Sequence, residues 1–479
     1  MRKKVIFILA QQLWKDAFRS RIMNIASLLM LFLLIFSSYS GWENYHDQNN
    51  TRTSIQKDVQ ESWENNPDKH PHRMAHYGSF ALRIKHILSV FDLGMENFVG
   101  NAVFLEAHKQ NTVNFSEASM STGLLRFGEV SLAMLLKVIV PLLLFYLGFA
   151  TIAQERENGT LKLLIGQGIA RKQIVFGKWL GLWSLSLVFL LTTFLVVIIF
   201  VLTESHEFIQ MESIIRYLVL LVSYFLFFGI LSAITILVSA FSKTAKSALV
   251  KLLGIWLLFV IIVPKSLQAM GYYLYPTPSK IEMETAVEDE ITALGDSHNP
   301  NDPHYKSLKD SVLLANNVER VEDLPFNYGG YVMAKGEALT AQVYQKHQDA
   351  IYKVYDKQNT LERYSAFANP YTAIKNVSMA FSGTDFQSFL HFKSEAESYR
   401  FKLAQEMNRL QMDLIPNEGH TGPEIISSDY WKEFPPFEYD FLSIEHVLKN
   451  ELTSLTALIF WGLLSIFGLL TLSSNLKAI

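Results

Sequence analysis

Residues 179–202 read WLGLWSLSLVFLLTTFLVVIIFVL, a run without a charged side chain. A helix needs ~20 predominantly apolar residues to cross the ~30 Å hydrocarbon core of a bilayer. This run is long enough, and a helix satisfies its own backbone hydrogen bonds inside lipid. We therefore expect a membrane-spanning helix here, which makes the chain an integral membrane protein.

Five further apolar runs qualify as spans, or nearly do, by the same criterion. The six expected spans are residues 22–40, 130–153, 179–202, 214–240, 248–264 and 452–472, the fifth ending near Pro264. The first could instead be a signal peptide, but it is long for one, and Tyr39 fits poorly at a cleavage site. The expected fold is an α-helical polytopic membrane protein with six transmembrane helices.

Basic residues are unevenly distributed among the polar segments. Lys and Arg concentrate in residues 1–21, 154–178, 241–247 and 473–479, whereas 203–213 has glutamates and no Lys or Arg. Cytoplasmic loops carry an excess of Lys and Arg. We therefore expect both termini in the cytoplasm and two outer domains, 41–129 and 265–451, on the opposite side. The larger of these is acidic overall, which does not favour a nucleic-acid binder.

The outer segments differ in their patterns. Apolar residues recur at helical spacing around Val343, and residues 385–414 also favour a helix, so the larger domain is expected to be mostly α. Short alternating runs such as 102–115 indicate strands, so the smaller domain is expected to be α+β. Within residues 1–21, apolar side chains recur at nearly helical spacing and basic residues flank or interrupt them, which predicts an amphipathic helix along the cytoplasmic interface. The alternative is a frayed basic tail. The sequence contains no cysteine, which excludes disulfides.

The loop before the run at 179–202 carries the most specific pattern. Residues 154–178 read QERENGTLKLLIGQGIARKQIVFGK. We expect Thr160 to cap a short helix that begins at Leu161, with Leu164 and Ile165 on the same face as Leu161. Such an apolar face can enter a groove on a partner, and the flanking charges can orient that contact. The alternative is an ordinary basic loop.

This ordered motif resembles the cytoplasmic signature of ABC-2-type transporter permeases. The resemblance assigns coupling to an ATPase to Glu155, Arg156, Glu157, Gly159, Thr160, Leu161, Leu164, Arg171, Gly177 and Lys178. Stretches such as His76-Tyr77-Gly78 and Pro276-Thr277-Pro278-Ser279 resemble a subfamily with large periplasmic insertions and a domain of uncharacterised function. The resemblance implies a multi-pass protein of the bacterial inner membrane that forms the translocation pathway of an ATP-driven exporter.

The chain lacks a phosphate-binding loop of its own. Phe176-Gly177-Lys178-Trp179 has neither the preceding glycine nor the following hydroxyl of that motif. We therefore expect no enzyme activity and no cofactor in this chain; the resemblance implies that a separate ABC ATPase subunit binds ATP and magnesium.

The resemblance also implies a second permease, either a copy of this chain or a paralogue. The outer domains could receive cargo or dock a periplasmic partner. The alternative function is a membrane-anchored sensor or scaffold whose outer domains bind a ligand. Six spans are more than anchoring requires, which favours the transporter.

Lys137 is a charged residue inside the second expected span. Pro141 follows four residues later and cannot donate to the Lys137 carbonyl, so a kink is expected there. Ionisable groups in a membrane are candidates for a translocation path. The favoured alternative is that Lys137 snorkels towards the outer face.

His70, His72 and His76 form a small cluster in the first outer segment. Neutral imidazoles suit zinc or copper, which makes these residues a candidate metal site. The simpler interpretation is an exposed loop with incidental histidines.

Overall fold

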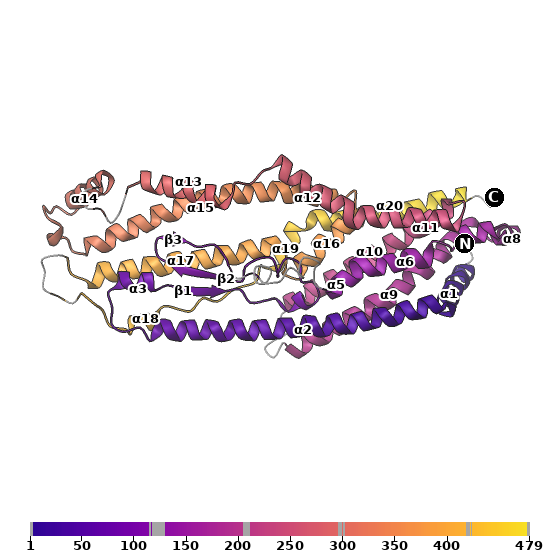
Figure 1. Ribbon diagram of the computed structural model, residues 1–479, viewed down its shortest axis with the longest axis horizontal. Helices are drawn as coiled ribbons and strands as arrows, with labels where there is room; N and C mark the ends of the chain where they lie inside the picture. Colours follow the sequence, from indigo (N-terminus) through magenta and orange to yellow (C-terminus); the bar gives the residue numbers. More distant parts are fainter. Residues whose placement is uncertain are drawn as a thin grey trace.

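The computed structural model describes residues 3–114, 116, 130–204, 211–295, 299, 302–417, 422 and 424–476. The molecule is elongated, with a bundle of long apolar helices at one end and a distal region at the other (Figure 1). We define the distal region as residues 42–114 and 275–441. The first and last described elements, α1 (Lys3–Arg19) and η6 (Ser473–Asn475), lie at the bundle end.

Among the described residues, six helices are long and apolar enough to cross a membrane, as expected. They are Met23–Glu64, Leu132–Glu157, Arg171–Thr203, Met211–Phe241, Ala245–Leu274 and Leu452–Leu472. Four of these spans are single helices: α2 (Arg21–Glu64), α9 (Arg171–Glu204), α10 (Met211–Phe241) and α20 (Leu452–Leu472). The second span consists of α5 (Leu132–Met134), η3 (Leu135–Ile139), α6 (Val140–Gly148) and α7 (Ala153–Glu157). The fifth consists of α11 (Ala245–Leu257), η4 (Leu258–Ile262) and α12 (Val263–Leu274).

The helix of the first span extends well beyond the apolar run that predicted it. The helix α2 has 44 residues and continues from the bundle into the distal region, past the predicted end at residue 40 (Figure 1). No Gly or Pro occurs between Gly41 and Pro67, so nothing in the sequence interrupts the helix where its apolar character stops. Its N-terminus is capped by Ser20, whose hydroxyl accepts from the Met23 N–H.

The helix α1 packs on the protein with one face. Leu9, Leu13 and Ala17 are buried there, and Trp14 Nε1 donates to Ser184 Oγ of α9 at 2.8 Å. The approach of α1 to α9 is close, because a Cβ added at Gly177 would lie 2.7 Å from Leu9 Cβ. The expected interfacial helix is therefore attached to the third span.

Prolines distort two spans without ending them. Pro141 and Pro264 each follow a π-helical segment, η3 and η4. The helix expected to end near Pro264 continues to Leu274. Side chains bind carbonyls within both segments: Trp256 Nε1 donates to Val138 O at 3.1 Å, and Asn369 Nδ2 donates to Phe259 O at 2.8 Å. In lipid, the carbonyls of a distorted helix need such partners within the protein.

The distal region consists of helices around a small sheet. Its elements are α3 (Pro71–Tyr77), β1 (Ser79–Leu82), η1 (Ile87–Val90), β2 (Ala102–Glu106), β3 (Lys109–Gln110), α13 (Lys280–Ala293), α14 (Pro303–Ala315), η5 (Val321–Asp323), α15 (Tyr328–Ser365), α16 (Pro370–Phe381), α17 (Phe386–Leu414) and α18 (Tyr430–Glu433). The strands form an antiparallel sheet in the order β1-β2-β3, with Phe80 opposite Phe104. The short helix α19 (Ile444–Asn450) leads into α20.

The two segments that were expected as separate outer domains share their hydrophobic cores. One core joins Ala81 and Leu105 of the sheet to Phe392 of α17. The other joins Trp63 of α2 to Trp431 of α18, and Trp63 Nε1 donates to the Trp431 carbonyl at 3.1 Å. The described parts of both segments therefore form one body. Some parts of the expected segments lie outside the description, namely residues 1–2, 115, 117–129, 205–210, 296–298, 300–301, 418–421, 423 and 477–479.

Candidate functional site

The predicted coupling segment contains two short helices, α7 and α8 (Thr160–Gly166). Gly159 connects them with φ +74°, a left-handed conformation that glycine adopts without a steric penalty. Thr160 is not the cap that the sequence predicted, because it is the first residue of α8. Its hydroxyl instead donates to the Glu155 carbonyl at 3.0 Å, which ties α8 back to α7.

The helix α7 is bonded to the junction of α10 and α11. Arg156 donates to the carbonyls of Ala240 and Ser242, at the end of α10. Glu157 Oε2 accepts from the Ala245 N–H at 3.1 Å, at the first residue of α11. Arg156 and Glu157, two of the charged residues expected to orient a partner, therefore bind this chain's own backbone.

A buried serine holds the turn into α7. Ser239 Oγ of α10 donates to Phe149 O at 2.8 Å and accepts from the N–H groups of Ile152 and Ala153 at 3.1 Å each. The hydroxyl thus binds the backbone where the helix of the second span breaks.

A third connection joins α7 to α9. Glu155 Oε1 lies 2.7 Å from Lys178 Nζ, and both side chains are largely buried. Arg171, at the start of α9, donates to the Ser474 carbonyl at 3.1 Å. The charged residues of the predicted motif therefore fix α7 to α9, α10 and α11, and Arg171 fixes α9 to the C-terminal segment.

The helix α8 has an inward and an outward face. Leu161 is fully buried, and Leu164 and Ile165 pack against the core of the bundle. The face that the sequence predicted for a partner is thus turned towards this chain. The outward face carries Leu163, which is 65% exposed, and the exposed Lys162.

Basic residues gather at this end of the molecule. Helices α1 and α8 lie there together with both termini (Figure 1). The described basic residues on these and the adjoining elements include Lys3, Lys4, Lys15, Arg19, Arg21, Arg156, Lys162, Arg171, Lys172, Lys178, Lys243 and Lys246.

Lys137 pairs with an aspartate and does not snorkel, so the favoured expectation was wrong. Lys137 Nζ lies 2.6 Å from Asp92 Oδ2, and both side chains are buried. Asp92 also accepts from the Ser378 hydroxyl, which lies 2.9 Å from the Tyr224 hydroxyl. This cluster joins the second span, α10 and α16. The distortion expected at Pro141 is present as η3.

The histidines are regrouped in the structure. His72 and His76 lie on α3, as their spacing allows, but the third ring near them is His108, between β2 and β3. His70 has a different role, because its Nδ1 accepts from the His72 N–H at 3.2 Å and caps α3.

A polar hollow of about 720 Å³ lies between α15 and α17 in the distal region. Gln342, Gln345, Lys393 and Glu397 are among its lining residues. Burial lowers the pKa of Lys393 to about 8, an effect that the nearby Glu397 carboxylate opposes. The hollow therefore offers amides and both signs of charge to a polar ligand.

Comparison with known proteins identifies the family. Residues 8–294 match the model of the ABC-2 family transporter protein, which is more than half of the chain. The chain belongs to the ABC-2 transporter family. It is a multi-pass transporter permease, a membrane subunit that in this family is normally not an enzyme. Residues 280–440 match a domain of unknown function (DUF3526), and no curated protein matches the chain.

The ABC-2 match spans the first five spans and all of α7 and α8, whereas α20 lies beyond both matches. The sequence analysis of this permease did not single out Leu163, Asp92 or His108. Leu163 lies in the predicted short helix, but not on the face formed by Leu161, Leu164 and Ile165. Asp92 and His108 are remote in sequence from the residues they meet, so no local signal could pair them.

Proposed function

We propose that this ABC-2 permease is the transmembrane subunit of an ATP-driven exporter and that α7 and α8 couple it to a separate ATPase. The observation that carries the proposal is the contrast between the two helices. Arg156, Glu157 and the Glu155–Lys178 pair bind α7 to the spans, while α8 presents Leu163 outwards. An element of this kind can receive a partner on one side and transmit its movement on the other.

The bonds of α7 specify which spans would respond. A displacement of α8 would be transmitted to α9 through Lys178. It would be transmitted to the junction of α10 and α11 through Arg156 and Glu157. Packed helices shift as rigid bodies between discrete arrangements. Closure of the ATPase around nucleotide would therefore bias the packing of these three spans, which opens the pathway to one side or the other.

The proposed orientation has both termini and α8 in the cytoplasm of a bacterium and the distal region in the periplasm. It is supported by the basic residues at the bundle end, because Lys and Arg are retained on the cytoplasmic side. In this orientation the distal region stands where it can receive cargo or a periplasmic partner.

A second permease is part of the proposal, as a copy of this chain or a paralogue. The span Ala245–Leu274 is the least covered of the six, with 11% of its apolar window buried. Exposed side chains such as Leu253, Leu257 and Ile261 require either lipid or another permease.

The test is purification of the complex from its native membrane, followed by identification of the subunits that accompany it. We expect an ABC ATPase and ATP hydrolysis by the complex, with none by the isolated chain. Robust hydrolysis by the isolated chain, or a native complex without an ATP-binding subunit, would refute the proposal.

The polar hollow between α15 and α17 favours a second candidate, a membrane-anchored sensor or scaffold whose distal region binds a ligand. The same purification separates the two functions, because a sensor would be recovered without an ATPase.

A further inference from the structure

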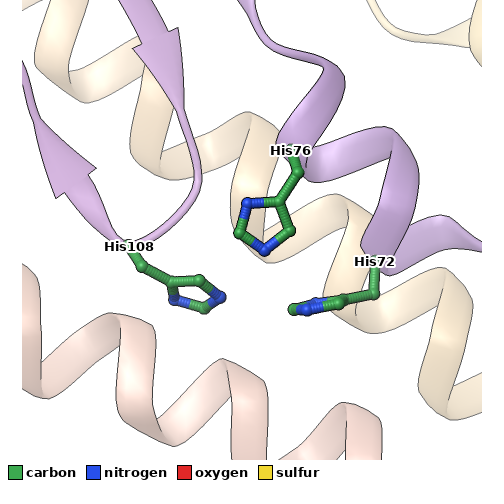
Figure 2. A group of neighbouring side chains, drawn as sticks. All are labelled: His72, His76 and His108. Atoms are coloured by element: carbon green, nitrogen blue, oxygen red, sulfur yellow. The ribbon is translucent and has the colours of Figure 1, made fainter.

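Three histidine rings converge in the distal region. His72 and His76 are four residues apart on α3 and so share one face of the helix. His108 approaches from the turn between β2 and β3, and Figure 2 shows the three rings directed towards one another. One nitrogen from each ring lies within 4.8 Å of the other two.

The elements that carry the rings are fixed to each other. The Ala107 N–H donates to the Ala75 carbonyl at 3.3 Å, which joins the turn to α3 next to the histidines. Ala75 and Ala107 also belong to the core that contains Trp63 and Trp431. The rings are therefore brought together by the fold and do not depend on a free loop.

The backbone of His108 is unusual. Its φ is +62°, in the left-handed region that few residues other than glycine adopt. Such conformations persist where the surroundings impose them, and they are concentrated at ligand-binding sites. Here the conformation lets the turn present the His108 ring to α3.

A buried carboxylate orients the His108 ring. Glu337 Oε2 accepts from the His108 backbone N–H at 2.7 Å and lies 3.1 Å from His108 Nδ1. Glu337 is fully buried, and its other oxygen lies 2.7 Å from Arg400 Nη1. Because a carboxylate accepts a proton from Nδ1, a neutral His108 ring has its lone pair on Nε2. The carboxylate–histidine arrangement is the usual support of a metal ligand.

We propose that His72, His76 and His108 bind a divalent transition-metal ion of the zinc and copper class, with Glu337 as the residue that positions His108. Three neutral imidazoles suit these ions and not calcium or magnesium, which prefer oxygen ligands. Nitrogens around a tetrahedral zinc are ~3.3 Å apart, given Zn–N bonds of ~2.0 Å, so small ring rotations complete the site. The exposed His76 leaves an approach from solvent and a fourth position for water.

The bound ion would link α3 to the β2–β3 turn. Through Glu337 the link extends to α15, and through Arg400 to α17. The proposal does not depend on the transport function or on the orientation of the chain.

The test uses the full-length chain in detergent, purified through a tag without histidine and treated with a chelator. Zinc binding is measured by competition with a chromophoric chelator, and cobalt substitution reports the geometry by its visible spectrum. We expect one tight site per chain, a tetrahedral cobalt spectrum and a higher thermal midpoint with zinc. His76→Ala and His108→Ala should each weaken zinc binding by about 100-fold or more, and Glu337→Gln by about 10- to 100-fold.

His70→Asn is the matched control, because asparagine keeps the helix cap and removes the imidazole. It should bind zinc as the unmodified chain does, with an unchanged cobalt spectrum. A chain that binds neither zinc nor copper stoichiometrically would overturn the proposal. So would binding that survives both His76→Ala and His108→Ala, or binding that His70→Asn abolishes while α3 remains folded.

Discussion

Glu155 of α7 and Lys178 of α9 form a largely buried ion pair, with 2.7 Å between Oε1 and Nζ. Removing one partner of a buried pair costs about 3–5 kcal/mol, because the other charge is left uncompensated. We therefore expect Glu155→Gln and Lys178→Met each to lower the thermal unfolding midpoint in detergent. The double variant should lower the midpoint by less than the sum of the decreases in the two single variants. Strict additivity would show that the pair does not hold α7 in place.

Asp92 and Lys137 give a second prediction. Asp92→Asn leaves the Lys137 ammonium without its carboxylate inside the bundle, so we expect a destabilisation of about 3–5 kcal/mol. Lys137→Met in the Asp92→Asn background should restore much of it. The measurement is the thermal midpoint of the purified permease, with Asp310→Asn, at an exposed position in α14, as the control. An Asp92→Asn chain as stable as the parent would contradict the pairing.

The orientation can be tested with single cysteines, since the chain has none. Asn158, between α7 and α8, and Ser307, on α14, are both exposed. In intact cells, an impermeant thiol reagent should label Ser307→Cys and spare Asn158→Cys. Both positions should react after the membrane is opened. The reverse pattern in intact cells would contradict the proposed topology.

Glu451 predicts a specific pH dependence. Burial raises the pKa of this carboxyl from 4.5 to about 7. The nearby Asp385 carboxylate also raises the pKa, whereas the hydrogen bond from the Ser454 hydroxyl and the charge of Arg363 lower it. The folded state therefore holds the proton more tightly than the unfolded state. Stability should fall as the pH rises from about 4.5 to about 7, by an amount of up to about 3 kcal/mol.

Glu451→Gln should remove this part of the dependence. The variant should be more stable than the parent at pH 8 and similar to it near pH 4.5. Thermal midpoints across this range provide the comparison, and parallel curves for the two chains would argue against a buried neutral carboxyl.

The spans could be predicted from sequence because length and hydropathy are local properties. The same reasoning did not predict how far the first helix extends, since hydropathy falls after Tyr39 while α2 continues to Glu64. The absence of Gly and Pro between Gly41 and Pro67 was the available signal.

Partners remote in sequence could not be predicted. The pairing of Lys137 with Asp92 and the replacement of His70 by His108 depend on how distant segments pack. His70 and His72 are close in sequence, yet the His70 side chain caps α3 and is not part of the group of three rings. Sequence spacing therefore grouped His70 with His72 and His76, whereas the fold brings His108 to His72 and His76.

The central claim is that α8 docks on a separate ATPase through its exposed face. The most direct measurement is the amount of ATPase that co-purifies per permease. Leu163→Asp should lower it strongly, since losing a central interface anchor commonly costs ~2 kcal/mol or more, about thirty-fold in affinity. Leu314→Asp, at a leucine that is 80% exposed in α14, is the matched control and should retain the ATPase. Both variants should keep the monodispersity of the parent, whereas Leu161→Ala, a buried change, should lower thermal stability. Undiminished ATPase recovery and coupled hydrolysis in the Leu163→Asp complex would contradict the account.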